Sequence, residues 1–225
     1  SNDCKAAEKK LVKAASKVYK KFLASCPAPD APGSKQVAAL MTITGLIDAP
    51  KADKEFLSIN GAQGFSTFYG YYMLEAMATA GNYQGALDVI REYWGAMIDL
   101  GATSFWEDFD INWIPNATPI DELVPEGKKD IHGDCGAYCY VGFRHSLCHG
   151  WASGPTSWLS RHILGVEVIE PGCRQVRITP HLGDLQWVKG TFPTPYGEIQ
   201  IYHEKQANGN VISEVKAPKG VSVIK

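Results

Sequence analysis

The hydrophobic periodicity of this chain changes once, near Val166, and this change limits what the chain can fold into. Before it, apolar residues recur with helical spacing; after it, apolar and polar residues alternate in short runs separated by Gly, Pro and Asn-Gly turns. These runs are RQVRITP, LQWVKGTF, GEIQIYHEK, NVISEVKA and VSVI. The sequence therefore predicts a helical region over residues 1–165 and a small antiparallel β unit over residues 166–225.

Four helices are predicted within the first 100 residues, joined by short connections that favour antiparallel hairpins. They cover residues 5–23, 34–47, 66–80 and 82–100. Ser34 is suited to cap the second helix, and Gly81 and Gly101 are suited to end the third and fourth. A further helical segment is expected over residues 145–165, where Pro155 would split or kink it.

A long irregular region is predicted between residues 101 and 143, and such regions are usually functional or mobile. It opens with GATSFWEDFD, residues 101–110, which holds three carboxylates and three aromatic side chains in ten residues. Glu107, Asp108 and Asp110 are all candidates for a catalytic carboxylate. Either aspartate could instead accept hydrogen bonds from backbone amides of the loop.

Charge and composition exclude several classes of partner. A net charge of -2 and a pI near 6.3 provide no general attraction to nucleic acid or to acidic membrane surfaces. No apolar run approaches the roughly 18 residues of a membrane span. The chain starts with SND and no methionine, which suggests a fragment of a longer protein. The partner is expected to be small or neutral.

Six cysteines are too few in a chain of 225 residues to indicate a disulfide scaffold. A metal site can be drawn from a group of His and Cys residues in the irregular region and just after it. The group is His132, Cys135, Cys139, Cys148 and His149. Zinc ligands usually show tighter paired spacings, and free cysteine is a common core residue, so no metal or other cofactor is expected.

Three longer stretches, taken in order, resemble a known family. They are WGAMIDLGATSFWEDFD, HSLCHGWASGPTSWLSRHILGVEVIEPG and ITPHLGDLQWVKGTFPTPYGEIQIYHE. They look like the carboxyl-terminal part of bacterial α-L-rhamnosidases, and the resemblance extends from about Lys35 to Lys225. It implies the second half of an (α/α)6 catalytic toroid of the six-hairpin glycosidase type over residues 1–165. A carboxyl-terminal β-sandwich domain would follow over residues 166–225.

The resemblance also implies an activity, the inverting hydrolysis of terminal α-L-rhamnosides, with a rhamnose-containing glycoside or polysaccharide as partner. Glu107 matches the family's general base, and His149 matches a histidine that contacts the bound rhamnose. Trp94, Trp106 and Trp151 are possible rings for stacking on the sugar, although most tryptophans at helical spacing are core residues. Trp106 is selected because it is next to Glu107. From the residues alone, His149 could equally be a helix-start histidine bonded to backbone.

The stretch that carries the family's general acid has no counterpart in this chain. The chain alone is therefore expected to be inactive, and to pair with itself or repack where toroid helices are exposed. A periplasmic or secreted location follows from the role only. Two other function classes remain: another six-hairpin glycosidase or sugar phosphorylase, and a non-catalytic carbohydrate-binding module that uses the β-sandwich and exposed rings.

Overall fold

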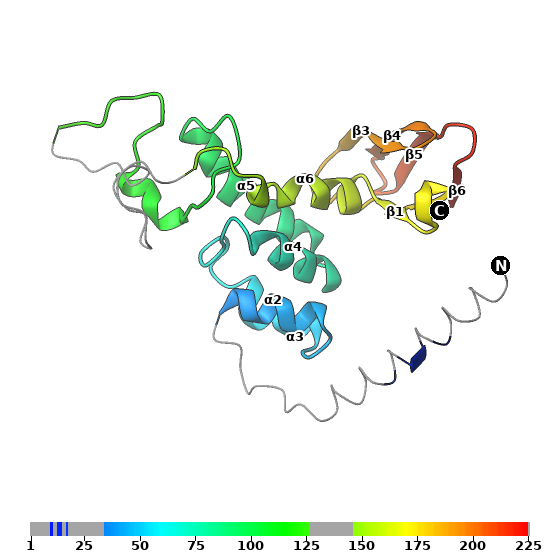
Figure 1. Ribbon diagram of the computed structural model, residues 1–225, viewed down its shortest axis with the longest axis horizontal. Helices are drawn as coiled ribbons and strands as arrows, with labels where there is room; N and C mark the ends of the chain where they lie inside the picture. The colour runs from blue at the N-terminus through cyan, green and yellow to red at the C-terminus, as the bar shows by residue number, and fades with distance from the viewer. Residues whose placement is uncertain (1–9, 11–12, 15–16, 18–33, 127–145, 225) are drawn as a thin grey trace.

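The computed structural model describes residues 34–126 and 146–224, together with the isolated helical residues 10, 13, 14 and 17. Helices come first along the chain, and the strands gather at one end of the helical part (Figure 1). The helix predicted over residues 5–23 lies almost entirely outside the described residues. Every described helix falls short of the length and apolar character that a membrane span needs.

Most of the described helices pack around one apolar core. Their bounds are α2 Lys35–Ile43, α3 Ala49–Ala52, η1 Asp53–Leu57, α4 Gly70–Thr79, α5 Tyr83–Asp99, η2 Ile111–Asn116, η3 Gly150–Ala152, α6 Gly154–Trp158 and η4 Leu159–Ile163. Of the short elements, η1 and η4 are π-helical and η2 and η3 are 3₁₀-helical. Neither α3 nor η1 was predicted from the sequence.

Helix α2 begins as predicted but ends earlier than predicted. The Ser34 hydroxyl accepts a hydrogen bond from the Val37 amide at 3.4 Å, which caps the helix. The predicted end at Ile47 is wrong because Gly45 adopts a positive φ of 73°. The amide of Leu46 then bonds back to the Met41 carbonyl at 2.8 Å, a Schellman ending that satisfies a carbonyl of the last turn.

Helices α4 and α5 stop at the predicted glycines. Gly81 and Gly101 have φ values of 80° and 90°, which residues with a Cβ rarely adopt. Between the two helices the Asn82 side chain accepts a hydrogen bond from the Gly85 amide at 2.9 Å and caps α5. The connection is short because Gly81, which ends α4, is followed directly by Asn82, which caps α5.

The predicted division of the segment over residues 145–165 is present: the turn η3 ends at Ala152, and α6 begins at Gly154. Pro155 lies in the first turn of α6, where its missing N–H would have had no helical partner. It therefore lies at the start of the second piece and not inside a helix. The preceding turn, η3, is separated from α6 by Ser153, and α6 continues directly into the π-helical turn η4.

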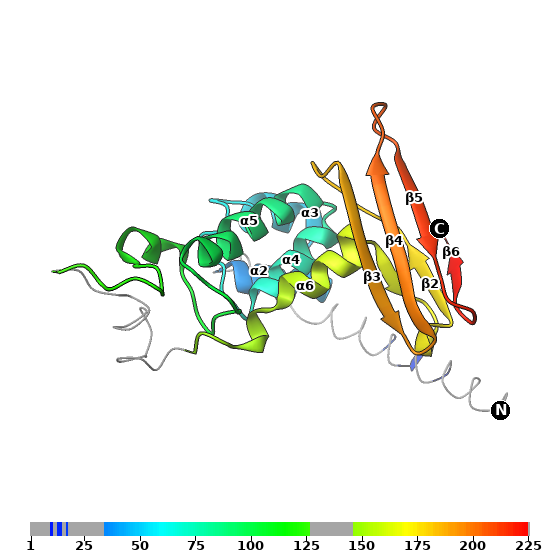
Figure 2. The same ribbon diagram turned by 90° about the horizontal axis from the view of Figure 1, so that it is seen from above.

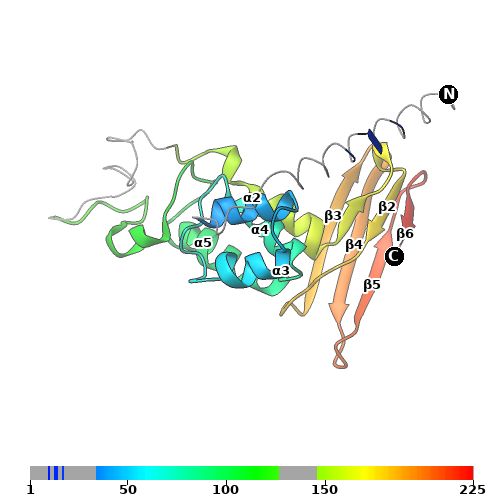
Figure 3. The same ribbon diagram turned by 90° about the horizontal axis from the view of Figure 1, so that it is seen from below.

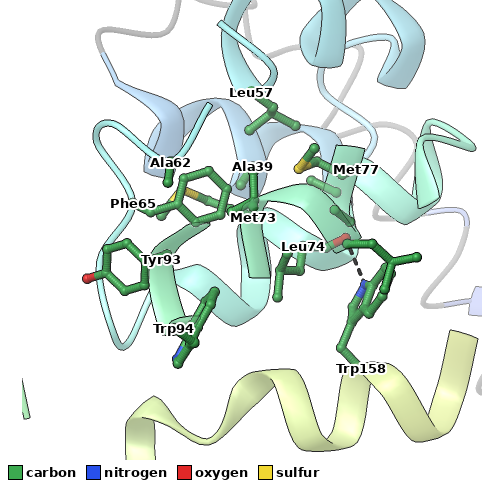
Figure 4. Close-up of a cluster of buried hydrophobic side chains, with 14 of the residues drawn as sticks. Ala39, Leu57, Ala62, Phe65, Met73, Leu74, Met77, Tyr93, Trp94 and Trp158 are labelled. Atoms are coloured by element: carbon green, nitrogen blue, oxygen red, sulfur yellow. Dashed lines mark hydrogen bonds between the residues drawn. The ribbon is translucent and has the colours of Figure 1, made fainter. Parts of the chain in front are cut away.

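The helical core lies between α4, α5 and α6. Figure 4 shows Met73, Leu74 and Met77 of α4 within the cluster of buried side chains, which also holds Leu57 and the rings of Phe65, Tyr93, Trp94 and Trp158. The Trp158 indole is fully buried and donates to the Leu74 carbonyl at 3.0 Å, so α6 is fixed to α4 by packing and by a hydrogen bond. A buried indole with its N–H satisfied is a stable arrangement.

Within the part of the chain that the structure describes, six strands form two three-stranded sheets. They are β1 Val166–Val168, β2 Gln175–Ile178, β3 Trp187–Thr194, β4 Gly197–Lys205, β5 Val211–Lys216 and β6 Ser222–Ile224; the 3₁₀ turn η5, Pro171–Cys173, joins the first two. The order is β1-β2-β6 in one sheet and β3-β4-β5 in the other. Figures 2 and 3 show both sheets at the same end of the molecule, with β3 nearest the helices. Four of the five predicted runs contain the observed strand entirely, and β3 extends two residues past its run.

The predicted antiparallel β unit is correct for three strand pairs and wrong for one. Strands β1–β2, β3–β4 and β4–β5 are antiparallel, but β6 pairs with β2 in parallel, with Val176 opposite Val223. The two sheets share one apolar core, in which Val176 and Ile178 of one sheet meet Ile199 and Ile201 of the other. The predicted hairpin at Asn208–Gly209 is present, as the loop between β4 and β5.

Specific contacts join the helices to the sheets. Arg91 of α5 forms a two-pronged ion pair with Asp184, with N–O distances of 2.8 and 3.0 Å. The rings of Tyr83 and His181 stack with centroids 3.7 Å apart. Gly165, between η4 and β1, has a φ of 78°, and its carbonyl accepts from the Thr179 amide at 2.9 Å. The last helix and the first strand therefore meet at a close backbone contact.

Candidate functional site

The acid-rich stretch after α5 is anchored to the helical core by its aromatic residues. Trp106 and Phe109 are both buried, and the Tyr93 hydroxyl of α5 donates to the Phe109 carbonyl. Glu107 lies between them in sequence and is partly exposed. The core therefore fixes the backbone on both sides of the one glutamate in this stretch.

Glu107 is held by the segment that precedes α6. Its amide donates to the Ser146 carbonyl at 2.8 Å, and the Ser146 amide donates to its Oε2 atom at 2.9 Å. Two residues away, the His149 amide donates to the Phe105 carbonyl at 2.6 Å. Residues 105–107 and 146–149 therefore run side by side, and both the backbone and the carboxylate of Glu107 are positioned by this pairing.

The carbonyl of Glu107 is also positioned, by two side chains from distant parts of the sequence. The Thr67 hydroxyl donates to it at 2.5 Å and the Trp151 indole donates at 2.7 Å. The Trp151 ring in turn lies against the His149 ring, with centroids 4.2 Å apart. The structure thus brings Glu107, His149 and Trp151 together, although 44 residues separate the first from the last.

Trp106 does not join this group on the surface. Its ring is 0% exposed within the helical core and meets Phe109 edge to face. A ring with no exposed face cannot stack on a sugar. Trp106, which was predicted to do so because it is next to Glu107 in the sequence, is therefore a core residue. Trp151, which is 45% exposed, is the ring that lies at the surface beside Glu107.

Exposed aromatic side chains extend the site beyond Trp151. The Phe68 ring packs edge to face against Trp151 at 5.7 Å and against Tyr72 at 5.8 Å. These three rings line a groove of about 860 Å³ that follows α6 as far as Arg161 and reaches β1 and β3. Sugar-binding sites commonly combine ring faces with hydroxyl and charged groups, and this groove offers both.

The competing acids have different surroundings. The Asp110 carboxylate accepts from the amide and the side-chain nitrogen of Asn112, both at 2.8 Å, and so caps the short helix η2. Asp108 accepts from the neighbouring Phe109 amide at 2.9 Å. Both aspartates therefore accept hydrogen bonds from backbone amides of the loop, which is the alternative role predicted for them.

The sequence-based metal hypothesis cannot be followed through most of its residues. His132, Cys135 and Cys139 lie outside the described residues. Cys148 has a free thiol whose sulfur accepts from the Ser104 hydroxyl at 3.3 Å. Within the described ranges, 34–126 and 146–224, no group of three His, Cys, Asp or Glu side chains is placed to hold a metal ion.

Sequence reasoning predicted Glu107 and His149 but not the residues around them. Thr67 and Ser146, which bond to Glu107, and Phe68, which packs against Trp151, carry no motif, because only the fold brings them to this region. Trp151 was one of the possible stacking rings but was set aside in favour of Trp106. Its contact with the Glu107 carbonyl comes from the fold and not from any local pattern.

The arrangement of a helical region followed by two small sheets is similar to part of several solved rhamnosidases. Among solved structures, the chain is similar to a GH78 family rhamnosidase of Bacillus sp. GL1, with 27% identity and a TM-score of 0.64 over 84% of this chain and 18% of that one. The α-L-rhamnosidase of Aspergillus terreus shares its fold with a TM-score of 0.71 and 19% identity, over 96% of this chain and 24% of that one.

A third similar structure is the α-L-rhamnosidase of Streptomyces avermitilis complexed with L-rhamnose, with a TM-score of 0.67 and 18% identity, covering 94% of this chain and 20% of that one. Residues 165–224 match the family model of the bacterial alpha-L-rhamnosidase C-terminal domain. The resemblance to the carboxyl-terminal portion of α-L-rhamnosidases is therefore confirmed. No curated protein matches the chain. This chain spans between about a sixth and a quarter of the length of the solved enzymes it resembles.

Proposed function

We propose that this chain is the carboxyl-terminal portion of an α-L-rhamnosidase that hydrolyses terminal α-L-rhamnosides with inversion, and that Glu107 is its general base. The observation that carries the proposal is the pairing of residues 105–107 with residues 146–149. It holds the Glu107 carboxylate by a 2.9 Å hydrogen bond from the Ser146 amide and places His149 in the same small region. The similarity to rhamnosidases supplies the substrate class.

Each residue has a distinct role in the proposed reaction. Inverting hydrolysis needs one carboxylate to activate water and one carboxylic acid on the opposite face to protonate the leaving oxygen. Glu107 is the base, and a positioned base contributes through its orientation as much as through its basicity. His149 exchanges hydrogen bonds with a sugar hydroxyl. Trp151 takes the stacking role first assigned to Trp106, because its ring is exposed.

The general acid would come from another part of the enzyme, so the isolated chain is expected to be inactive. We further propose that residues 1–165 form the second half of an (α/α)6 toroid and residues 166–225 a β-sandwich domain. The exposed apolar side chains of α2, which are Val37, Leu40 and Ile43, support this proposal. The other half of a toroid would cover them, and in its absence two copies of this chain would associate through them.

The substrate is a rhamnose-containing glycoside or polysaccharide, as suggested by the relative complexed with L-rhamnose. The corresponding location is the periplasm or the cell exterior, where such substrates are met. No cofactor is required, since water activation and leaving-group protonation are both carboxyl chemistry.

The test is Glu107→Gln in the longer enzyme that contains this chain. The amide keeps the shape of the side chain but cannot take a proton, so kcat should fall by about 10²- to 10⁴-fold or more, with little change in KM. Asp110→Asn is the matched control, because an asparagine can still cap η2 and kcat should hardly change. Near-normal turnover of an aryl α-L-rhamnoside by Glu107→Gln would remove the assignment.

A further inference from the structure

The sheet formed by β3, β4 and β5 has one face in the shared core and the other in solvent. Successive residues of a strand point to opposite faces, so Ile199 and Ile201 are buried while their neighbours are exposed. The solvent face carries alternate residues of all three strands, here called the outer face. They are Trp187, Lys189, Thr191, Gln200, Tyr202, Glu204, Glu214 and Lys216.

Two aromatic rings lie side by side on the outer face. Trp187 is 59% exposed, and its ring centroid is 6.5 Å from that of Tyr202, with the ring planes inclined by only 28°. Burying an indole is strongly favourable, so an indole this exposed is more often a contact surface for a ligand than a structural element. Together the two rings form a pair of neighbouring aromatic side chains on this face.

Polar groups of both signs surround the rings. The strand register sets Tyr202 between Lys189 on β3 and Glu214 on β5, and Lys216 follows two residues after Glu214. These side chains and both rings line a depression of about 850 Å³. The positive charges of the lysines and the negative charges of the glutamates on the outer face are equal in number, so the face does not attract a polyanion electrostatically. The same side chains supply hydrogen-bond donors and acceptors around the apolar rings.

We propose that the outer face is a second carbohydrate-binding site, which holds a neutral saccharide with pyranose rings stacked on Trp187 and Tyr202. A pyranose has an apolar face of C–H groups and a rim of hydroxyls, which is the complement of two rings bordered by lysine and glutamate side chains. Two neighbouring rings offer contacts to more than one sugar unit of a chain. Partial burial and the nearby Glu204 carboxylate raise the pKa of Tyr202, so its hydroxyl remains a donor.

This site shares no residue with the group formed by Glu107, His149 and Trp151, and it does not depend on the proposed hydrolysis. A surface that retains a polysaccharide would keep the substrate near a separate active site and so raise its effective concentration. The binding reaction involves no bond breaking, so it can be measured on this chain whether or not the chain turns over a rhamnoside.

The experiment is native electrophoresis of the 225-residue chain in gels that contain a soluble polysaccharide. The neutral polysaccharides tested in turn are arabinan, galactan, xyloglucan and a β-glucan. Polygalacturonate is the charged comparison. The chain should be retarded by at least one neutral polysaccharide and not by polygalacturonate. Trp187→Ala should weaken that retardation at least about tenfold, as removal of a central aromatic contact does at other binding surfaces. Trp187→Phe, which keeps a ring face, should retain part of it.

Ile98→Ala is the control, because it removes a 69% exposed apolar side chain of α5 that lies outside the outer face and outside the Glu107 group, and it should leave retardation unchanged. Circular dichroism checks that each variant is folded, which is expected because Trp187 is exposed. Absence of retardation by all four neutral polysaccharides would overturn the proposal. Equal retardation of the wild type and Trp187→Ala would also overturn it. If Trp187→Ala differed from the wild type only in its solution mass, the outer face would be a contact between copies of this chain and not a saccharide site.

Discussion

Replacing Gly165 by alanine should destabilise the protein much more than the same change at Gly209. Both glycines have a positive φ, 78° at Gly165 and 84° at Gly209. An alanine in this left-handed region costs about 1–2 kcal/mol at either position. The positions differ in their surroundings: a Cβ at Gly209 meets nothing within 4 Å, while one at Gly165 lies 2.4 Å from the Thr179 carbonyl carbon and 2.6 Å from the Pro180 nitrogen.

The contacts at Gly165 are backbone atoms, so no side chain can rotate to make room. The segment after β2 must move away from the end of η4, and overpacking of this kind costs about 1–3 kcal/mol. Gly165→Ala should therefore lower the free energy of unfolding by about 2–5 kcal/mol in total, against about 1–2 kcal/mol for Gly209→Ala. Urea denaturation of both variants, followed by circular dichroism, measures the difference.

The two variants share the loss of chain flexibility that alanine causes in the unfolded state, so this contribution cancels in the comparison. Equal destabilisation would mean that the close contact between Gly165 and Thr179 relaxes at no cost. A smaller effect at Gly165 than at Gly209 would refute the reasoning altogether, because the packing contribution would then have the wrong sign.

Two further outcomes are expected. The His203 imidazole bonds to the Leu164 carbonyl and the Ser213 hydroxyl, and burial lowers its pKa. Because the pKa of His203 is lower in the folded state than in the unfolded state, protonation favours the unfolded state. The free energy of unfolding should therefore fall as the pH drops below the ordinary pKa of 6.5. Urea midpoints of the wild type and His203→Gln between pH 5 and 8 test this, and an equal dependence on pH in both would contradict it. Under the proposed function the general acid and the other half of the toroid lie outside these residues, so the isolated chain should not hydrolyse an aryl α-L-rhamnoside and should have a light-scattering mass above that of one chain. Robust turnover by a monomer would place a second catalytic carboxyl group among these residues.

Local features of the fold were predictable because their causes are local. The Ser34 cap, the glycine endings of α4 and α5 and the alternating strands each depend on a few adjacent residues. The early end of α2 was missed because apolar residues continue to Ile47, whereas the helix stops before Gly45, which adopts a positive φ. The division of the last helical segment near Pro155 was predictable because proline is disfavoured inside a helix and accepted in its first turn.

The site was less predictable because its parts meet through tertiary packing. Glu107 and His149 were predicted by resemblance, and the structure brings their segments together. The exchange of Trp106 for Trp151 could not have been found from spacing: both are tryptophans near a candidate residue, and only the packed core distinguishes a buried ring from an exposed one. The contact between Thr67 and Glu107 spans 40 residues and leaves no pattern in the sequence.

The parallel pairing of β6 with β2 has a consequence for the order of folding. Strand β2 cannot acquire this neighbour until the chain has passed through β3, β4 and β5, since all three lie between the two partners. Pairing of strands that are distant in sequence is slow because the intervening loop must first be closed, whereas the hairpins of the second sheet form between adjacent segments. We therefore expect the meander β3–β4–β5 to be structured first, with β6 closing the other sheet last.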